Sequence, residues 1–280
     1  MKVRLLTALG MVVFGLPLLI FSDYIVYPLA LAAVSALAAW ELLRVLGLHR
    51  RYAISLPSYA LAALLPFFSY KLFVPAEEQR DYILIIALSV FAYLLYLAAV
   101  SVLSGGELKF SEISRAFMAV SYSTVSFTAL SLLRYMENGE YLFELVFIGA
   151  WVSDSFAYFT GRLLGRHKLA PRLSPKKTVE GSVGGIVFAT LAFVLYGFII
   201  EYFFGLQANY LALALSGVFA SVISQLGDLF ASLIKREYDV KDYSGLLPGH
   251  GGIMDRFDSI LAAATTLMVI CTLFPPFSVG

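Results

Sequence analysis

Long apolar segments separated by shorter polar ones run through almost the whole chain. A helix that crosses a bilayer needs about 20 mostly apolar residues, and nine segments of roughly that length can be found. Their approximate bounds are residues 5–21, 25–46, 54–74, 82–103, 117–133, 142–164, 183–204, 210–234 and 253–274. The pattern therefore predicts an all-α polytopic membrane protein with about nine transmembrane helices.

The composition agrees with this prediction and excludes several other classes. Hydrophobic residues make up 60% of the chain and charged residues 14%, whereas soluble domains carry about 25% charged residues. The net charge of +1 provides no overall field that would attract nucleic acid, so we expect no nucleic-acid partner. The single Cys271 excludes an intramolecular disulfide and a CxxC metal site.

Positive charges are divided very unequally between the two sides that nine spans would define. Of the 20 Lys and Arg residues, all but Lys71, Arg80 and Arg134 fall on the side of the N-terminus. Because cytoplasmic loops are enriched in Lys and Arg, we predict a cytoplasmic N-terminus and an outside C-terminus. The expected location is the cell membrane, inner or plasma, with a multi-pass topology.

The two halves of the sequence differ in the length and polarity of their connections. Two long loops, residues 162–182 and 235–252, are rich in Gly, Pro and charge and lie in the second half. We therefore predict that residues 1–140 form a scaffold and dimerisation part. Residues 141–280 would form the catalytic half, with a polar cavity and two cytoplasmic loops.

Asp228 lies inside a predicted span, where an acidic residue costs about 2.5–3.5 kcal/mol at the bilayer centre. Ser224 and Ser232 lie four residues to either side of it, and Lys235 follows, so these side chains share one helix face. Two interpretations stay open. Asp228 either pairs with a basic residue for packing or binds a metal ion or substrate.

Three glycines, Gly249, Gly251 and Gly252, flank His250 just before the last predicted span. Glycines let backbone N–H groups come close to an anion, and a glycine-rich turn that leads into a helix N-terminus is a typical phosphate site. His250 either donates a hydrogen bond to a phosphate or only closes the turn.

Acidic residues follow these glycines at helical spacing. Asp255, Asp258 and Ser259 lie at positions i, i+3 and i+4, and therefore on one face of a helix start. Carboxylates are also favoured there by the helix dipole, so simple capping is the alternative to a binding role.

Two further positions carry candidate chemistry in the second half. Lys176 and Lys177 precede a predicted helix and serve either topology and lipid headgroups or phosphate binding. Asp154 either pairs with Arg162 or faces the same cavity as Asp228.

Glu41 and Glu144 lie near predicted helix ends, where exposure costs little. We therefore assign neither residue a role.

Taken together, the carboxylates are hard oxygen ligands that suit Mg²⁺, and the neighbouring cations suit a polyphosphate. Walker-loop, HExxH and cysteine–histidine zinc motifs do not occur in the sequence. A transporter for an anionic solute would also use intramembrane aspartates, but it should show broken helices in both halves. A purely structural membrane protein would not need Asp228.

The 27 residues from Ser232 to Asp258 resemble the signature of the phosphatidate cytidylyltransferases, also called CDP-diacylglycerol synthases. The matching residues are Ser232, Lys235, Arg236, Lys241, Asp242, Leu247–Gly252 with the sequence LPGHGG, and Asp255–Asp258 with the sequence DRFD. The segments SPKKTVEG and SDSFAYFTGR are also similar to segments of that family, whereas the first half matches only in being hydrophobic.

The resemblance implies a reaction in which CTP and phosphatidic acid give CDP-diacylglycerol and pyrophosphate, with Mg²⁺ and an associated second cation, K⁺. It also implies a site that faces the cytoplasm, contact with the lipid bilayer, and a homodimer. By the same resemblance, the metal ligands are Asp228 and Asp255. The catalytic residues it implies are Asp228, Asp255, Lys235, Arg236 and Arg256. The substrate-binding residues expected are Lys176, Lys177, Ser232, Lys241, Asp242, Gly249, His250, Gly251, Gly252, Asp154 and Asp258.

Overall fold

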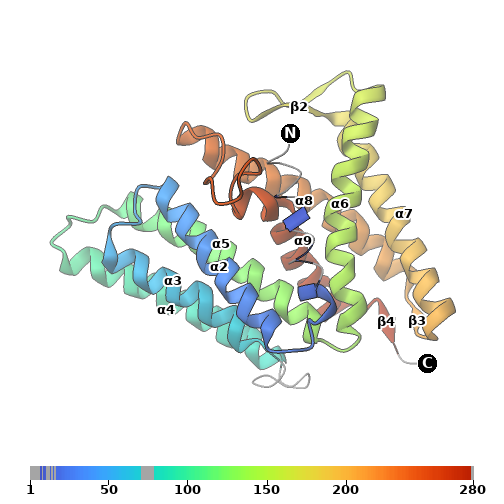
Figure 1. The fold of residues 1–280 in the computed structure, drawn as a ribbon, viewed down its shortest axis with the longest axis horizontal. Coiled ribbons are helices and arrows are strands. Elements are labelled where there is room, and N and C mark those ends of the chain that lie inside the picture. Colours follow the sequence, from blue (N-terminus) through green and yellow to red (C-terminus); the bar gives the residue numbers. More distant parts are fainter. Residues whose placement is uncertain are drawn as a thin grey trace. The chain divides into compact units, whose positions relative to one another are not determined.

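The structure, a computed structural model, describes residues 7, 9, 10, 13, 15, 17–70 and 79–278, without the side chains of residues 79 and 80. It is mostly helical (Figure 1). The helices are α2 (Val26–Val45), α3 (Tyr52–Phe68), α4 (Gln79–Leu103), α5 (Phe110–Tyr135), α6 (Gly139–Leu164), α7 (Val179–Phe204), α8 (Tyr210–Glu237) and α9 (Met254–Leu273). The strands are β1 (Lys168–Ala170), β2 (Ser174–Thr178), β3 (Gln207–Ala208) and β4 (Phe277–Ser278).

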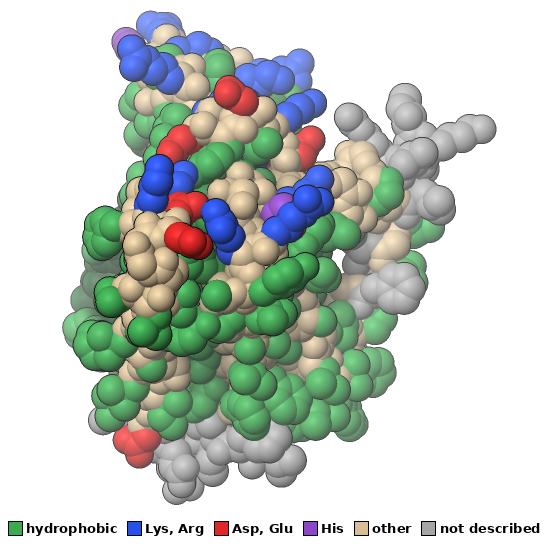
Figure 2. All heavy atoms as spheres, turned by 90° about the vertical axis from the view of Figure 1, so that its left-hand side faces the viewer, with side chains coloured by type: hydrophobic (Ala, Val, Ile, Leu, Met, Phe, Trp, Pro, Cys, Tyr) green, Lys and Arg blue, Asp and Glu red, His purple; other side chains and the backbone are tan. Residues whose placement is uncertain are grey.

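Seven helices of the described part are long and apolar enough to cross a membrane, namely α2 and α4 to α9. Helix α3 is also apolar but has only 17 residues. Large hydrophobic side chains are exposed along these helices, and Figure 2 shows them covering much of one face. The prediction of a helical multi-pass membrane protein is confirmed. The count of nine stays a prediction, because seven of the 17 residues of the first predicted span lie outside the described residues.

Two helices begin four or more residues earlier than the apolar pattern predicts, because a polar turn caps each of them. Helix α5 begins at Phe110 rather than near residue 117, and the backbone N–H of Lys109 donates to Glu112 Oε2 at 2.9 Å. Helix α7 begins at Val179 rather than near residue 183, and Thr178 Oγ1 accepts from Gly181 N at 3.1 Å. Such capping bonds satisfy N–H groups that the helix itself leaves unpaired.

The chain forms two compact units, whose boundaries fall within α5, at the end of α8 and near the start of α9. Unit 1 contains residues 1–132 and 238–256, and unit 2 contains residues 133–237 and 257–280. The predicted division of roles near residue 140 stays a prediction.

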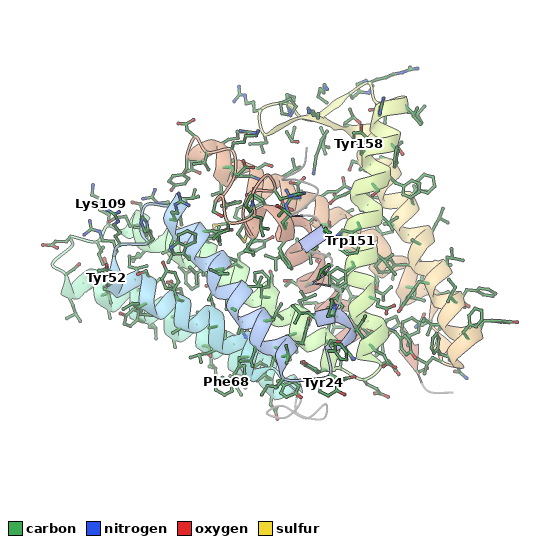
Figure 3. All side chains as sticks on the ribbon, in the orientation of Figure 1. Tyr24, Tyr52, Phe68, Lys109, Trp151 and Tyr158 are labelled. Atoms are coloured by element: carbon green, nitrogen blue, oxygen red, sulfur yellow. The ribbon has the colours of Figure 1, made fainter. Side chains whose placement is uncertain are left out.

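In unit 1, α2 and α3 lie side by side, and α4 packs against α3. Figure 3 shows Tyr24 and Phe68 at one end of the α2–α3 pair and Tyr52 at the other end, where Lys109 also lies. Aromatic side chains at both ends of apolar helices are typical of the two membrane–water interfaces.

Helix α4 donates side-chain hydrogen bonds to backbone carbonyl groups of α3. Pro57 lies inside α3 and has no N–H, so the carbonyl of Ala53 loses its helical donor. The hydroxyl of Tyr96 on α4 donates to that carbonyl at 2.8 Å, and Tyr82 OH donates to Leu65 O at 2.7 Å. Backbone groups in lipid must be satisfied within the protein, so α4 is part of what makes α3 stable there.

In unit 2, helices α6, α7 and α8 pack against one another at positions occupied by small residues. A Cβ atom at Gly181 of α7 would come within 2.5 Å of the carbonyl oxygen of Ala157 on α6. One at Gly217 of α8 would come within 2.8 Å of Thr190 Cα on α7. Glycine at these positions allows the backbones to approach closely, as is common between membrane helices.

A polar junction links the same three helices. Gln225 Nε2 on α8 lies 3.3 Å from Ser153 Oγ on α6, from Ser182 O on α7 and from Ser221 Oγ on its own helix. Ser153 and Ser221 are themselves hydrogen-bonded at 2.7 Å.

Two short antiparallel strand pairs supplement the helices of unit 2. Strand β1 pairs with β2, which leads directly into α7. Strand β3, between α7 and α8, pairs with β4 near the C-terminus. The apolar pattern did not predict these strands, because strands of two to five residues carry too little hydrophobic alternation to be recognised.

Candidate functional site

Unit 2 contains a pocket of about 340 Å³ that is lined by residues of α6, β1, β2, α7 and α8. Its volume falls in the range of roughly 300–1,000 Å³ typical of small-molecule sites. The charged residues of its lining are Asp154, Arg162, Lys176, Lys177 and Asp228. Three cationic and two acidic side chains therefore share one pocket, a combination suited to an anionic ligand together with a metal ion.

Helix α6 contributes a face with residues spaced four apart. Asp154, Tyr158 and Arg162 all line the pocket from this face, and Figure 3 marks Tyr158 on α6. Arg162 Nη1 lies 3.4 Å from Tyr158 OH, and no ion pair joins Arg162 to Asp154 among the described residues. Of the two interpretations of Asp154, the structure therefore agrees with the one in which it faces the same cavity as Asp228.

Asp228 on α8 forms an ion pair with Lys177 at the end of β2. One interpretation of Asp228 was that it pairs with a basic residue, and this pair is present. The pair lies in a pocket, however, and not in a packed core. The side chains of Asp228 and Lys177 are 27% and 24% exposed, although the Nζ atom of Lys177 is itself buried.

Asp258 on α9 lies close enough to Asp228, Asp154 and Lys235 to interact with them electrostatically. Its Oδ1 accepts the backbone N–H of Ser259 at 2.8 Å. Several carboxylates and a lysine are therefore gathered within unit 2.

Glu180 at the start of α7 anchors the segment that leads into the β1–β2 hairpin. Its Oε2 accepts from Arg166 N at 3.0 Å, and its Oε1 lies 2.6 Å from His167 Nδ1. This arrangement holds the hairpin against the N-terminus of α7, and the hairpin in turn carries Lys176 and Lys177.

Unit 1 contains the glycine-rich segment and Asp255. Asp255 is largely buried, and its Oδ2 accepts the backbone N–H groups of Tyr243 at 2.8 Å and Gly252 at 2.9 Å. Gly249 and Gly251 have φ angles of +78° and +82°, which non-glycine residues rarely adopt, so these glycines shape the turn.

Glu41 on α2 is a residue that sequence reasoning missed. We expected it to be exposed near a helix end, and this was wrong, because its side chain is fully buried. Its Oε1 accepts from Ser244 Oγ at 2.5 Å and Ile253 N at 2.9 Å, and its Oε2 accepts from Met254 N at 2.8 Å. The available signal was its position several residues inside an apolar span, because an acidic residue there needs partners.

The remaining predicted residues differ in their accessibility. Arg256, Lys241 and Asp242 are exposed in unit 1, and His250 is half-buried. In the described part of the chain, the Nδ1 atom of His250 is buried without a hydrogen-bond partner. On α8 of unit 2, the predicted residues Ser232 and Lys235 are half-buried and Arg236 is exposed.

The predicted residues thus fall into two groups, one in each unit. Unit 2 brings together Asp154, Asp228, Lys176 and Lys177 around one pocket. Unit 1 holds Asp255 together with the glycine-rich segment.

Comparison with known proteins agrees with the motif over nearly the whole chain. The sequence profile of the cytidylyltransferase family matches residues 2–274. A phosphatidate cytidylyltransferase of Bacillus subtilis (strain 168) is 36% identical over 280 residues, which cover 98% of each chain. One of Staphylococcus haemolyticus (strain JCSC1435) is 31% identical over 96% of this chain and 98% of its own. One of Haemophilus influenzae (strain Rd) is 46% identical over 127 residues, 45% of this chain and 44% of its own. The chain therefore belongs to the cytidylyltransferase family, as the residues from Ser232 to Asp258 led us to predict.

Proposed function

We propose that this protein transfers the cytidylyl group of CTP to phosphatidic acid, giving CDP-diacylglycerol and pyrophosphate. Membership in the cytidylyltransferase family and the names of the similar proteins support the reaction. The single structural observation that carries it is the pocket of unit 2, where Lys176, Lys177 and Arg162 lie with Asp154 and Asp228. Such a pocket suits a triphosphate, and the apolar helices around it suit a substrate that stays in the bilayer.

The chemistry needs charge neutralisation more than a strong base. A phosphate oxygen of the lipid forms a new bond to the α-phosphorus of CTP, and the bond from that phosphorus to the β-phosphate bridging oxygen breaks. The second pKa of a phosphomonoester is about 6, so the attacking group is largely dianionic at neutral pH. Both reactants are polyanions, and positioning together with electrostatic stabilisation supplies most of the catalysis in such transfers.

The residues of the pocket provide this neutralisation. Lys176 and Lys177, at the end of the β1–β2 hairpin, are placed to hold the phosphates of CTP. Arg162 adds a third cation from α6. Charge-assisted hydrogen bonds from such groups strengthen as charge develops on the leaving pyrophosphate.

A magnesium ion is part of the proposal. Among the described residues, no group of three or more His, Cys, Asp or Glu could hold a metal ion by itself. Mg²⁺ is commonly bound through one or two carboxylates with waters and substrate phosphates, so the carboxylates Asp228 and Asp154 in one pocket still fit it. When bound, Mg²⁺ would neutralise phosphate charge and help to orient the reacting oxygens. Asp228 is proposed as a ligand, and Asp255 keeps its proposed role as a second metal-binding carboxylate.

The proposed site faces the cytoplasm, where CTP is found. The distribution of Lys and Arg along the sequence supports this orientation, because 17 of the 20 lie on the predicted cytoplasmic side. The cell membrane as the location, a homodimer, and K⁺ as a second cation belong to the same proposal.

The decisive test is turnover by the purified protein in detergent with phosphatidic acid, CTP and Mg²⁺. We expect CDP-diacylglycerol and pyrophosphate in equal amounts, with little product when ATP, GTP or UTP replaces CTP. The absence of both products from a folded, monodisperse preparation would refute the proposal. Uptake of an anionic solute into sealed vesicles without nucleotide turnover would instead support the transporter alternative.

A further inference from the structure

Glu41 has an environment that simple packing does not require. It lies on α2 between fully buried apolar residues such as Ala38 and Leu42. Burying a carboxylate costs several kcal/mol unless hydrogen bonds compensate, and an apolar side chain of similar size would often pack as well or better. The donors that compensate the charge are Ser244 Oγ, Ile253 N and Met254 N.

Two of these donors are the backbone amides at the very start of α9. A helix N-terminus offers unpaired N–H groups and the positive end of the helix dipole, and therefore favours an anion. Here the anion is the protein's own carboxylate, with Oε1 on Ile253 N and Oε2 on Met254 N. These two amides are consequently engaged by Glu41 and not by a substrate phosphate.

The contact between Glu41 and the start of α9 also explains why position 252 is a glycine. A Cβ atom there would overlap the carboxylate of Glu41. The close approach that requires glycine at this position is therefore the approach of Glu41.

Glu41 is also connected to Asp255 through two short segments. Ser244 donates to Glu41, and the backbone N–H of its neighbour Tyr243 donates to Asp255 Oδ2. Gly252, which precedes the two amides bound by Glu41, donates to the same Asp255 oxygen. The buried carboxylate of Glu41 thus fixes the two segments whose backbone N–H groups orient the carboxylate of Asp255.

We propose that Glu41 is a positioning residue for cytidylyl transfer, which holds residues 243–254 so that the Asp255 carboxylate has a fixed orientation for Mg²⁺. The inference rests on the proposed function. In Glu41→Gln, the amide group still fills the space, but its NH₂ would face one of the two backbone N–H groups. One amide of α9 therefore loses its acceptor, and the fixed arrangement around Asp255 loosens.

The first experiment needs no turnover. The full-length protein in detergent is heated with increasing Mg²⁺ and without nucleotide or lipid, and the rise in the unfolding temperature is recorded. A ligand that binds the folded state raises this temperature according to its affinity. We expect Glu41→Gln to need about 10-fold more Mg²⁺ than the wild type for the same rise, the lower end of the loss seen when residues that orient metal ligands are changed. The matched control is Glu107→Gln, which removes an exposed carboxylate of unit 1 and should behave like the wild type.

The second experiment separates positioning from a merely structural role. The proposal expects Glu41→Gln to raise the Mg²⁺ concentration for half-maximal turnover while the KM for CTP, measured at saturating Mg²⁺, changes less than twofold. An unchanged Mg²⁺ requirement in both experiments would overturn the proposal. An equal rise in the Mg²⁺ concentration for half-maximal turnover and in the KM for CTP would also overturn it. If Glu41→Gln does not fold, Ser244→Ala, which removes one of the three donors, decides by the same criteria.

Failure of the proposed function gives a different result from failure of this inference. If the wild type forms no CDP-diacylglycerol, the proposed function is refuted. The Mg²⁺-dependent unfolding of the wild type and Glu41→Gln then still decides whether Glu41 positions a metal-binding carboxylate.

Discussion

Lys177 forms an ion pair with Asp228, and both side chains line the same pocket of unit 2. The residue predicted to bind phosphate and the residue predicted to bind metal are therefore direct partners. Removing one member of a partly buried pair leaves the charge of the other uncompensated. We therefore expect substitutions at these two positions to have effects that do not simply add.

Replacing Asp228 with Asn should reduce turnover strongly while preserving the fold. The amide keeps the shape of the side chain but removes the charge that pairs with Lys177. Losing one preorganised electrostatic group in an active site typically costs about 100-fold or more in kcat. CDP-diacylglycerol formation at saturating CTP measures the effect, and Asp81→Asn, an exposed acid at the start of α4, is the matched control. Turnover of Asp228→Asn within twofold of the wild type would contradict a catalytic role for Asp228.

Replacing Lys177 with Gln should mainly weaken the binding of CTP. A hydrogen bond to a charged group contributes about 1.5–3 kcal/mol, and the lower end of this range corresponds to about a 10-fold rise in KM. Lys168→Gln, on the other strand of the same hairpin, is the matched control because Lys168 does not line the pocket. An unchanged KM for CTP in Lys177→Gln would contradict the phosphate-binding role.

Removal of divalent metal should stop turnover without unfolding the protein. The helices are stabilised by packing between α6, α7 and α8 and by internal hydrogen bonds such as those of Gln225, none of which needs a metal ion. Addition of EDTA should therefore abolish formation of CDP-diacylglycerol and leave the circular dichroism spectrum unchanged, and excess Mg²⁺ should restore activity. Undiminished turnover in EDTA would show that the reaction needs no such ion.

A valine at Gly217 should destabilise unit 2. The added Cβ would lie 2.8 Å from Thr190 Cα and 3.2 Å from a ring atom of Phe193, so α7 and α8 would have to move apart. Overpacking of this kind costs about 1–3 kcal/mol. Thermal unfolding in detergent should show a lower midpoint for Gly217→Val, whereas Leu215→Val, at an exposed position of the same helix, should change it little. Equal midpoints would mean that the contact between the helices is looser than described.

The helices could be predicted well from the sequence, because a run of about 20 apolar residues is typical of a transmembrane helix. Helices α2, α6 and α8 have bounds within a few residues of those predicted. The starts of α5 and α7 could not be found in this way, since the bonds of Glu112 and Thr178 extend each helix into a polar turn that hydropathy does not include.

The candidate site was predictable residue by residue only where a motif or an unusual charge marked it. Asp228 was recognisable because an acid inside a span is costly. The side chain that pairs with it was not, since Lys177 lies on a separate hairpin. Glu41 was missed for a related reason: its donors Ser244 and Met254 lie 203 and 213 positions along the chain, and no local pattern connects them.

The bonds from Tyr82 and Tyr96 on α4 to the backbone of α3 have a consequence for how the protein is made. While α3 is leaving the ribosome, α4 has not yet been synthesised, and the carbonyl of Ala53 has neither its helical donor nor its tyrosine. A short span with an unsatisfied carbonyl is a poor substrate for release into lipid. We therefore expect α3 to wait beside the translocon and to enter the bilayer together with α4 as a helical hairpin.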